Sequence, residues 1–285
     1  VPPGPPLRAA VPDDEGVLSR LAPARRRLVA GLLIVAAVAV VLTVSALLLG
    51  RRSGGGLVAT ATPGPVLIVP GYGGSQASVQ PLAATLRDDG RDVTVVALAD
   101  GAQGDLGAQA DTVGVAVDAA LARTGATTVD LVGYSAGGVV ARLWVTENGG
   151  SDRVRRLVTL GSPHHGTEVA SLGGLVSGAC PTACQQLATD SPLLSRLDRE
   201  PVPPGLVFLS LWSTRDEVVV PPSSAVVDGV PSPSLQSICP SSTARHGDLP
   251  SDPLVQSLVG TALGVGPLPH WGTGDCARLA APTTS

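Results

Sequence analysis

The sequence predicts an α/β fold in which a mostly parallel central sheet carries helices on both faces. Between residues 64 and 265, short runs of valine and leucine alternate with segments in which apolar residues recur every three or four positions. The first pattern is typical of buried strands and the second of amphipathic helices. Such an alternation favours a parallel sheet that is covered on both sides.

The apolar runs predict strands at Val66–Val69, Val93–Leu98, Val129–Val132, Val154–Leu160 and Leu206–Trp212, with a weaker strand within 225–238. The helical patterns begin near Val79, Leu106, Val139 and Asp252 and stop at Gly90, Gly125, Gly149 and Gly264. Glycine commonly follows the last turn of a helix, and an Asp-Pro pair is a favourable start. The glycines therefore set the expected helix ends.

Composition narrows the class of protein. The chain has 285 residues, of which 44% are hydrophobic, enough for one or two domains with a substantial core. With one phenylalanine and no methionine, that core must consist mainly of valine, leucine and alanine. Residues 1–52 carry seven arginines against three acids, whereas the remainder carries twelve arginines against twenty acids. An acidic body without a basic patch argues against nucleic acid as a partner.

The first 63 residues differ from the rest. Residues 1–27 form a proline-rich, basic tail that we expect to be disordered. Residues 28–50 contain no charged side chain, and at about 1.5 Å per residue a helix of this length spans a bilayer core. We therefore predict one N-terminal transmembrane helix, followed by a flexible linker at 51–63.

The flanking charges predict how this helix is oriented. Five arginines precede the apolar segment and two follow it, so the N-terminus is expected in the cytoplasm and the folded body outside it. A cleaved signal peptide, which would release a secreted protein, is the alternative, although Arg51 and Arg52 follow the segment and the nearest small-residue cleavage pattern lies well downstream, at 59–61. The folded body is expected to span 64–265, with a C-terminal tail at 266–285.

The stretch 129–140 carries the strongest functional signal. It reads as a buried strand, a Gly-Tyr-Ser-Ala-Gly turn at 133–137 and a helix. Glycines two residues either side of Ser135 allow a sharp strand-to-helix bend that lifts the hydroxyl off the sheet, and the helix directs its positive end at this position. The alternative is a glycine-rich turn in a Rossmann-like unit, because short motifs of this kind also arise by chance.

Residues 64–263 resemble the α/β-hydrolases and, within that fold, the class 2 lipases and similar small bacterial esterases. The motifs that carry the resemblance are V-L-I-V-P-G-Y-G-G at 66–74, V-D-L-V-G-Y-S-A-G-G at 129–138, L-V-T-L-G-S-P-H-H-G-T at 157–167, S-T-R-D-E-V-V-V at 213–220 and H-G-D at 246–248. The fold requires a nucleophile, an acid and a histidine in that order along the chain. Ser135, Asp216 and His246 satisfy this order.

The resemblance implies that Ser135 is the nucleophile, that His246 is its general base and that Asp216 orients the imidazole. His246 is favoured because it follows the last predicted strand and precedes the last predicted helix. The other histidines remain alternatives: His164, His165 and His270. Glu217, which is adjacent to Asp216, is the alternative acid.

Two backbone N–H groups are expected to form an oxyanion hole. One belongs to Ala136, which follows the nucleophile, and the other to Tyr72, on the loop after the first strand. The family often has His-Gly where this chain has Pro70-Gly71. Because the donor is a backbone group, this departure costs little.

His164 and His165 also follow a predicted strand and are candidates for lining the pocket, with ordinary loop structure as the alternative. No metal is expected, because two adjacent histidines need further ligands and no Cys/His cluster accompanies them. The chemistry that the resemblance implies requires no cofactor.

Four cysteines in a domain expected outside the cytoplasm suggest two disulfides, for which three pairings exist. We expect Cys180–Cys184, which would close a tight loop. The second pair is then Cys239–Cys276, which would bracket His246 in the chain and tie the tail to the body.

These features predict a serine carboxylic-ester hydrolase, a lipase or esterase that acts on a lipidic or small ester through an acyl-enzyme. We expect a monomer attached to the membrane by its N-terminal helix. Two alternatives remain open at this point: an envelope acyltransferase that uses the same three residues, and a non-catalytic binding protein with this fold. Apolar residues within 161–204 suit an acyl chain, but they equally suit ordinary packing on the sheet.

Overall fold

The computed structural model describes residues 62–171 and 180–281, together with six residues between 32 and 40. The chain divides into two compact units, 1–54 and 55–285. The described residues of the first unit, among them Leu32 and Ile34, are helical and exposed. Most of the predicted transmembrane segment 28–50 lies outside the described residues. Within the described part of the chain, none of the helices combines the length and the apolar character that a membrane crossing requires.

The second unit is built on a five-stranded sheet with the order β2-β1-β3-β4-β5, in which all neighbours are parallel. The strands are β1 (Val66–Val69), β2 (Val93–Val95), β3 (Val129–Tyr134), β4 (Val154–Leu160) and β5 (Val207–Leu211). Every residue of β1, β3 and β4 is buried, as the apolar runs require. The predicted parallel sheet is confirmed, although β2 ends three residues before the expected end at Leu98.

The weaker strand expected within 225–238 does not form. This stretch makes a single bridge, between Ser234 and Trp212, and then enters a short helix, α8 (Leu235–Ile238). Pro231 accepts a hydrogen bond at 3.0 Å from the backbone N–H of Ser210, so the segment does run beside β5. Pro231 and Pro233 have no N–H to donate, and the ladder therefore cannot extend.

The four helices that the sequence predicts are confirmed as α2 (Gln80–Asp88), α3 (Leu106–Thr124), α4 (Ala136–Glu147) and α9 (Pro253–Ala262). The side chain of Asp105 caps α3, and that of Asp252 caps α9. Gly125 ends α3 with a φ of 69°, a left-handed conformation that glycine adopts without strain. Shorter helices include α6 (Thr182–Gln186), α7 (Pro192–Leu197) and α10 (Cys276–Leu279).

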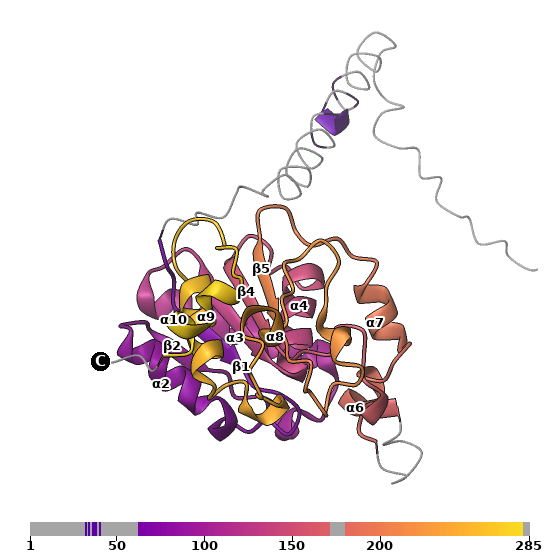
Figure 1. The fold of residues 1–285 in the computed structure, drawn as a ribbon. Coiled ribbons are helices and arrows are strands. Elements are labelled where there is room, and N and C mark those ends of the chain that lie inside the picture. Colours follow the sequence, from indigo (N-terminus) through magenta and orange to yellow (C-terminus); the bar gives the residue numbers. More distant parts are fainter. Residues whose placement is uncertain are drawn as a thin grey trace, which may run out of the picture. The chain divides into compact units, whose positions relative to one another are not determined.

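Helices cover both faces of the sheet (Figure 1). Leu67 and Val69 of β1 face a core that includes α3 and α4, and Val66 and Ile68 face a core that includes α2 and α9. Since the strands are parallel, the chain leaves all of them at one edge of the sheet. The loops after β1, β3, β4 and β5 therefore meet there, which is where ligand sites form in such folds.

Candidate active site

Ser135 lies in a tight bend between β3 and α4, with φ 53° and ψ −128°. A side chain on Gly133 would overlap the backbone of Gly138, and one on Gly137 would overlap the carbonyl oxygen of Val69. The backbone N–H of Ser135 donates to the carbonyl of Leu160, at 2.8 Å, and so ties the bend to the end of β4. The two glycines of the motif therefore serve close backbone approach, as the sequence predicts.

Ser135, His246 and Asp216 form one chain of hydrogen bonds. The distance from Ser135 Oγ to His246 Nε2 is 3.0 Å, and that from His246 Nδ1 to Asp216 Oδ2 is 2.7 Å. The second carboxylate oxygen of Asp216 accepts from the backbone N–H groups of Val218 and Val219, at 2.9 and 2.8 Å. The structure thus brings together the three residues that the sequence singled out, and each carboxylate oxygen has a defined donor.

Loops from distant parts of the chain hold this arrangement. Asp216 follows β5, and His246 begins a 3₁₀ helix, His246–Asp248, that precedes α9. The hydroxyl of Ser213 donates to the carbonyl of Ala244, at 2.5 Å, which joins the acid loop to the histidine loop. A Cβ on Gly161 would lie 3.0 Å from Asp216 Oδ2 and 3.3 Å from His246 Nδ1. The first glycine of the Gly-Ser-Pro-His-His loop therefore makes room for the acid and the base.

Tyr134 is a further residue of the site that the sequence did not reveal. Its hydroxyl donates to the backbone carbonyl of His246, at 3.1 Å, and its ring centroid lies 5.2 Å from that of the imidazole. Burial, followed by the negative charges of Asp216, Asp248 and Glu217, raises the pKa of Tyr134 to about 12. The hydroxyl therefore stays protonated and remains a donor. Tyr134 occupies a variable position of the motif, so no sequence signal distinguishes it.

An apolar pocket of about 190 Å³ opens beside Ser135. Its lining combines residues next to the serine, the start of the loop after β4, the end of α6 and the loop after Asp216: Tyr72, Ser135, Ala136, Pro163, Thr167, Val169, Ala170, Cys184, Leu187, Val218 and Val219. A cavity with this lining beside a nucleophile suits a short apolar chain.

Comparisons with known proteins identify the fold. Residues 65–197 match the family model described as palmitoyl protein thioesterase. Aspergillus fumigatus lipase B has a similar structure, with a TM-score of 0.64, 22% identity and coverage of 73% of this chain and 54% of that chain. The mature form of Bacillus licheniformis lipase BlEst2 gives a TM-score of 0.59, 17% identity and coverage of 74% and 97%, respectively. The chain has the α/β-hydrolase fold.

The predicted resemblance to lipases and esterases of the α/β-hydrolase superfamily is thereby confirmed. The chain spans about half the length of the Aspergillus lipase and of the propeptide form of the Bacillus lipase. No curated protein sequence matches it.

Within this fold, both predicted oxyanion residues border the pocket. Ala136 is the first residue of α4, and Tyr72 lies on the loop after β1. Gly71 brings that loop against the serine, because a Cβ at this position would lie 2.9 Å from Ser135 Cβ and 3.4 Å from Ser135 Oγ. The residues expected to form the oxyanion hole therefore lie near Ser135, Tyr72 on the loop after β1 and Ala136 at the start of α4.

His164 and His165 differ from the expectation that they line the pocket. Pro163 and Thr167 of the same loop line it instead. His164 is fully buried against Phe208, and its Nε2 lies 3.0 Å from Thr159 Oγ1. Burial, and then the positive charge of Arg142, holds the pKa of His164 well below its usual range, so this imidazole is neutral. The chain turns inward at 164, and the imidazole fills the core rather than the pocket.

His165 serves to hold its loop in place. Its Nδ1 lies 2.7 Å from Asp198 Oδ2, and its Nε2 lies 2.8 Å from the carbonyl oxygen of Val226. Asp198 also pairs with Arg142, at 3.3 Å. These contacts match the alternative of ordinary loop structure.

Both expected disulfides are confirmed. Cys180 and Cys184 are joined with a Cα–Cα distance of 5.4 Å, and Cys184 lines the pocket. Cys239 and Cys276 are joined across a separation of 37 residues, a stretch that contains His246. The second bridge ties the end of α8 to the start of α10.

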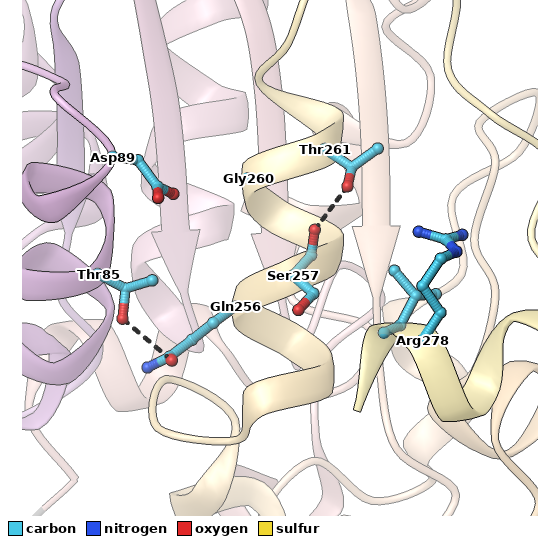
Figure 2. Close-up of a pocket in the computed structure, with 8 residues that line it drawn as sticks. Thr85, Asp89, Gln256, Ser257, Gly260, Thr261 and Arg278 are labelled. Atoms are coloured by element: carbon cyan, nitrogen blue, oxygen red, sulfur yellow. Dashed lines mark hydrogen bonds between the residues drawn. The ribbon is translucent and has the colours of Figure 1, made fainter. Parts of the chain in front are cut away.

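A separate polar cavity of about 360 Å³ lies between α2, α9 and α10. Figure 2 shows Thr85 of α2 facing Gln256 on α9, with Asp89 just beyond the end of α2. The Thr85 hydroxyl donates to the side-chain oxygen Oε1 of Gln256 at 3.0 Å. The lining of this cavity shares no residue with that of the apolar pocket. Among the described residues, no group of three or more His, Cys, Asp or Glu is placed to hold a metal ion.

Proposed function

We propose that this protein is a serine hydrolase that cleaves carboxylic esters with an apolar acyl chain through an acyl-enzyme intermediate. The observation that carries the proposal is the hydrogen-bonded series Ser135–His246–Asp216 at the mouth of an apolar pocket. A serine hydroxyl is too weakly acidic to attack an ester at neutral pH, and a base within hydrogen-bond reach removes this obstacle.

In the first half of the reaction, Ser135 Oγ attacks the carbonyl carbon of the ester, and His246 Nε2 accepts the proton. Asp216, fixed by the N–H groups of Val218 and Val219, stabilises the imidazolium that forms. His246 then returns the proton to the departing alcohol, which leaves the acyl group on Ser135. In the second half, water attacks the acyl-enzyme in the same way and releases the carboxylic acid.

The negative charge on the tetrahedral intermediate needs donors. We assign this role to the backbone N–H groups of Tyr72 and Ala136, two residues that line the pocket together with Ser135. The N-terminal end of α4, which begins at Ala136, adds its positive end dipole. Donors of this kind commonly contribute about 10²–10³-fold to kcat each.

Thioesters are a second candidate class of substrate, and the match to the palmitoyl protein thioesterase model favours it. The same attack on the carbonyl carbon applies, with a thiol as the leaving group. An acyltransferase would differ only in the second half, where an alcohol replaces water.

We further propose that the catalytic unit acts outside the cytoplasm, attached to the membrane through residues 28–50. The supporting observations are the charge-free apolar segment, the arginines that precede it and the two disulfides, which persist in oxidising compartments. Extraction of cell membranes at alkaline pH tests this proposal. Recovery of the intact chain in the soluble fraction would argue for a secreted or peripheral protein instead.

The direct test of the chemistry compares matched acyl esters and acyl thioesters, from two to sixteen carbons, with the wild type and with Ser135→Ala. We expect hydrolysis by the wild type and a loss of about 10⁴-fold or more in kcat for the variant. The chain-length optimum then separates an esterase from a lipase, and the ratio of the two series separates esters from thioesters.

Ser257→Ala is the matched control, because Ser257 lines the polar cavity and lies away from the apolar pocket. It should retain the wild-type rate. Equal rates in the wild type and Ser135→Ala would sink the proposal. Product appearing only when an alcohol acceptor is added would move the assignment to a transferase.

A further inference from the structure

We propose that a left-handed turn at Asp100–Ala102 positions the oxyanion loop, defined here as residues 70–74. The inference rests on the proposed function, since it assigns a role in the same reaction to residues outside the Ser135–His246–Asp216 series. The observation behind it is a run of three consecutive residues with positive φ, at 50°, 60° and 54°.

The backbone of this turn packs directly against the oxyanion loop. A Cβ on Gly74 would lie 3.0 Å from the carbonyl carbon of Gly101 and 3.3 Å from the backbone nitrogen of Ala102. On its other side the loop meets the nucleophile through Gly71. The loop that carries Tyr72 is therefore held by backbone-to-backbone packing between Ser135 and the turn.

The turn is itself anchored to the wall of the apolar pocket. The carbonyl of Gln103 accepts from the backbone N–H of Ala183, in α6, at 3.1 Å. The backbone N–H of Leu106 donates to the side-chain oxygen of Gln186, at the end of α6, at 2.8 Å. Cys184, also in α6, lines the pocket. Helix α6 thus contributes to the wall of the apolar pocket and also holds the segment that follows the turn.

The conformation of the turn is costly for two of its residues. Left-handed backbone is strained for residues that carry a Cβ, and such strain persists only where surrounding structure enforces it, commonly at functional sites. Ala102 adopts it while its side chain is buried, and Asp100 adopts it at the surface. Gly101, between them, adopts it without strain. We infer that this strained turn determines how close the oxyanion loop lies to Ser135.

The role assigned to Gly101 is that of a positioning residue. Displacement of the loop would move the Tyr72 N–H away from the oxyanion, a charge that exists only in the tetrahedral intermediate and the transition states around it. The loss should therefore appear in kcat and not in KM.

A pair of substitutions at Gly101 isolates the backbone conformation from the presence of a side chain. A Cβ here would lie 3.6 Å from the nearest atom, the carbonyl oxygen of Gly73, which is ordinary van der Waals contact without overlap. Asparagine tolerates positive φ, whereas a β-branched residue such as valine does not. We expect Gly101→Val to lower kcat about 10–100-fold with KM within twofold, and Gly101→Asn to stay within threefold of the wild type.

Gly104→Val is the control, because Gly104 has open space around it and its φ lies outside the left-handed range. It should leave kcat unchanged. Gly101→Ala, a milder change, should give a smaller loss and serves if Gly101→Val does not fold, which its thermal unfolding will show.

A second readout separates positioning from a general structural effect. An alkyl boronic acid adds to the serine and places a negatively charged oxygen where the oxyanion forms, whereas a dialkyl ether of the same length binds as a neutral molecule without such an oxygen. Gly101→Val should raise the inhibition constant of the boronic acid in parallel with the loss in kcat, and leave that of the ether within twofold.

The inference is overturned if Gly101→Val keeps wild-type kcat and boronate affinity, or if Gly101→Asn loses as much as Gly101→Val. A wild-type protein that neither hydrolyses any ester or thioester nor binds the boronic acid would instead overturn the proposed function, and this inference with it.

Discussion

At Ser135 the backbone takes a conformation that residues other than glycine rarely adopt. Close packing of Gly133 and Gly137 and the hydrogen bond to Leu160 enforce it. The bend at Ser135 was predictable from the sequence. Only small residues fit on either side of it, so the spacing of Gly133 and Gly137 around the serine indicates the bend. The hydrogen bond from the Tyr134 hydroxyl to the carbonyl oxygen of His246 was not predictable, since it joins residues that are 112 positions apart and meet only in the fold.

Tyr134→Phe removes one hydrogen bond to the backbone of His246 and keeps the ring against the imidazole. A neutral hydrogen bond contributes about 1 kcal/mol, so we expect kcat to fall roughly fivefold through looser placement of the base. Steady-state kinetics on the best ester measure the effect. Tyr72→Phe is the control, because we assign Tyr72 a backbone role that this change leaves intact. An unchanged kcat in Tyr134→Phe would show that the hydroxyl does not position His246.

At the scale of elements, the ends of parallel strands explain why residues 135, 216 and 246 meet. Strand and helix positions were predictable because the apolar runs and glycine stops are regular. The stretch 225–238 was mispredicted because its prolines interrupt the ladder while its apolar residues still suggest a strand. The inward turn of His164 was also not predictable, since two adjacent histidines look alike in sequence and only the packing around Phe208 tells them apart.

The Cys239–Cys276 bridge should stabilise the element that carries His246. It closes 37 residues, against four for Cys180–Cys184. In the chain-entropy view, the longer loop corresponds to a contribution of about 2–4 kcal/mol to the free energy of unfolding. Replacing both Cys239 and Cys276 by alanine should lower that free energy accordingly, as measured by urea unfolding.

The matched control replaces Cys180 and Cys184 by alanine, for which the chain-entropy view gives a smaller loss. Cys184 of the Cys180–Cys184 pair lines the pocket, so the double substitution should also change the preferred acyl chain length. A larger loss of stability from the short bridge than from the long one would contradict this ranking.

At the scale of the whole molecule, buried His164 makes the stability of the fold depend on pH. Burial holds its pKa well below the ordinary value of 6.5, so the folded protein keeps it neutral while the unfolded chain protonates as pH falls below about 6.5. Above pH 6.5 His164 is neutral in both states and does not lower the free energy of unfolding. Below pH 6.5 that free energy falls progressively on acidification. We expect the free energy of unfolding to fall by about 1.4 kcal/mol per pH unit below 6.5 on account of this one group.

Urea unfolding at several pH values between 5 and 8 measures this slope for the wild type and for His164→Gln, in which the slope should be reduced by that amount. His165→Gln is the matched control, because His165 is partly exposed and hydrogen-bonded at the surface. Identical slopes in the wild type and His164→Gln would show that His164 does not account for the acid sensitivity.

The central claim is that Ser135 is a nucleophile activated by His246. The most direct measurement is labelling of the intact protein with an alkyl fluorophosphonate, followed by mass spectrometry of its peptides. We expect one adduct for each chain, on the peptide that contains Ser135, with no labelling of Ser135→Ala and labelling slowed by orders of magnitude in His246→Ala. An absence of adduct in the wild type, or an adduct that persists in Ser135→Ala, would contradict the account.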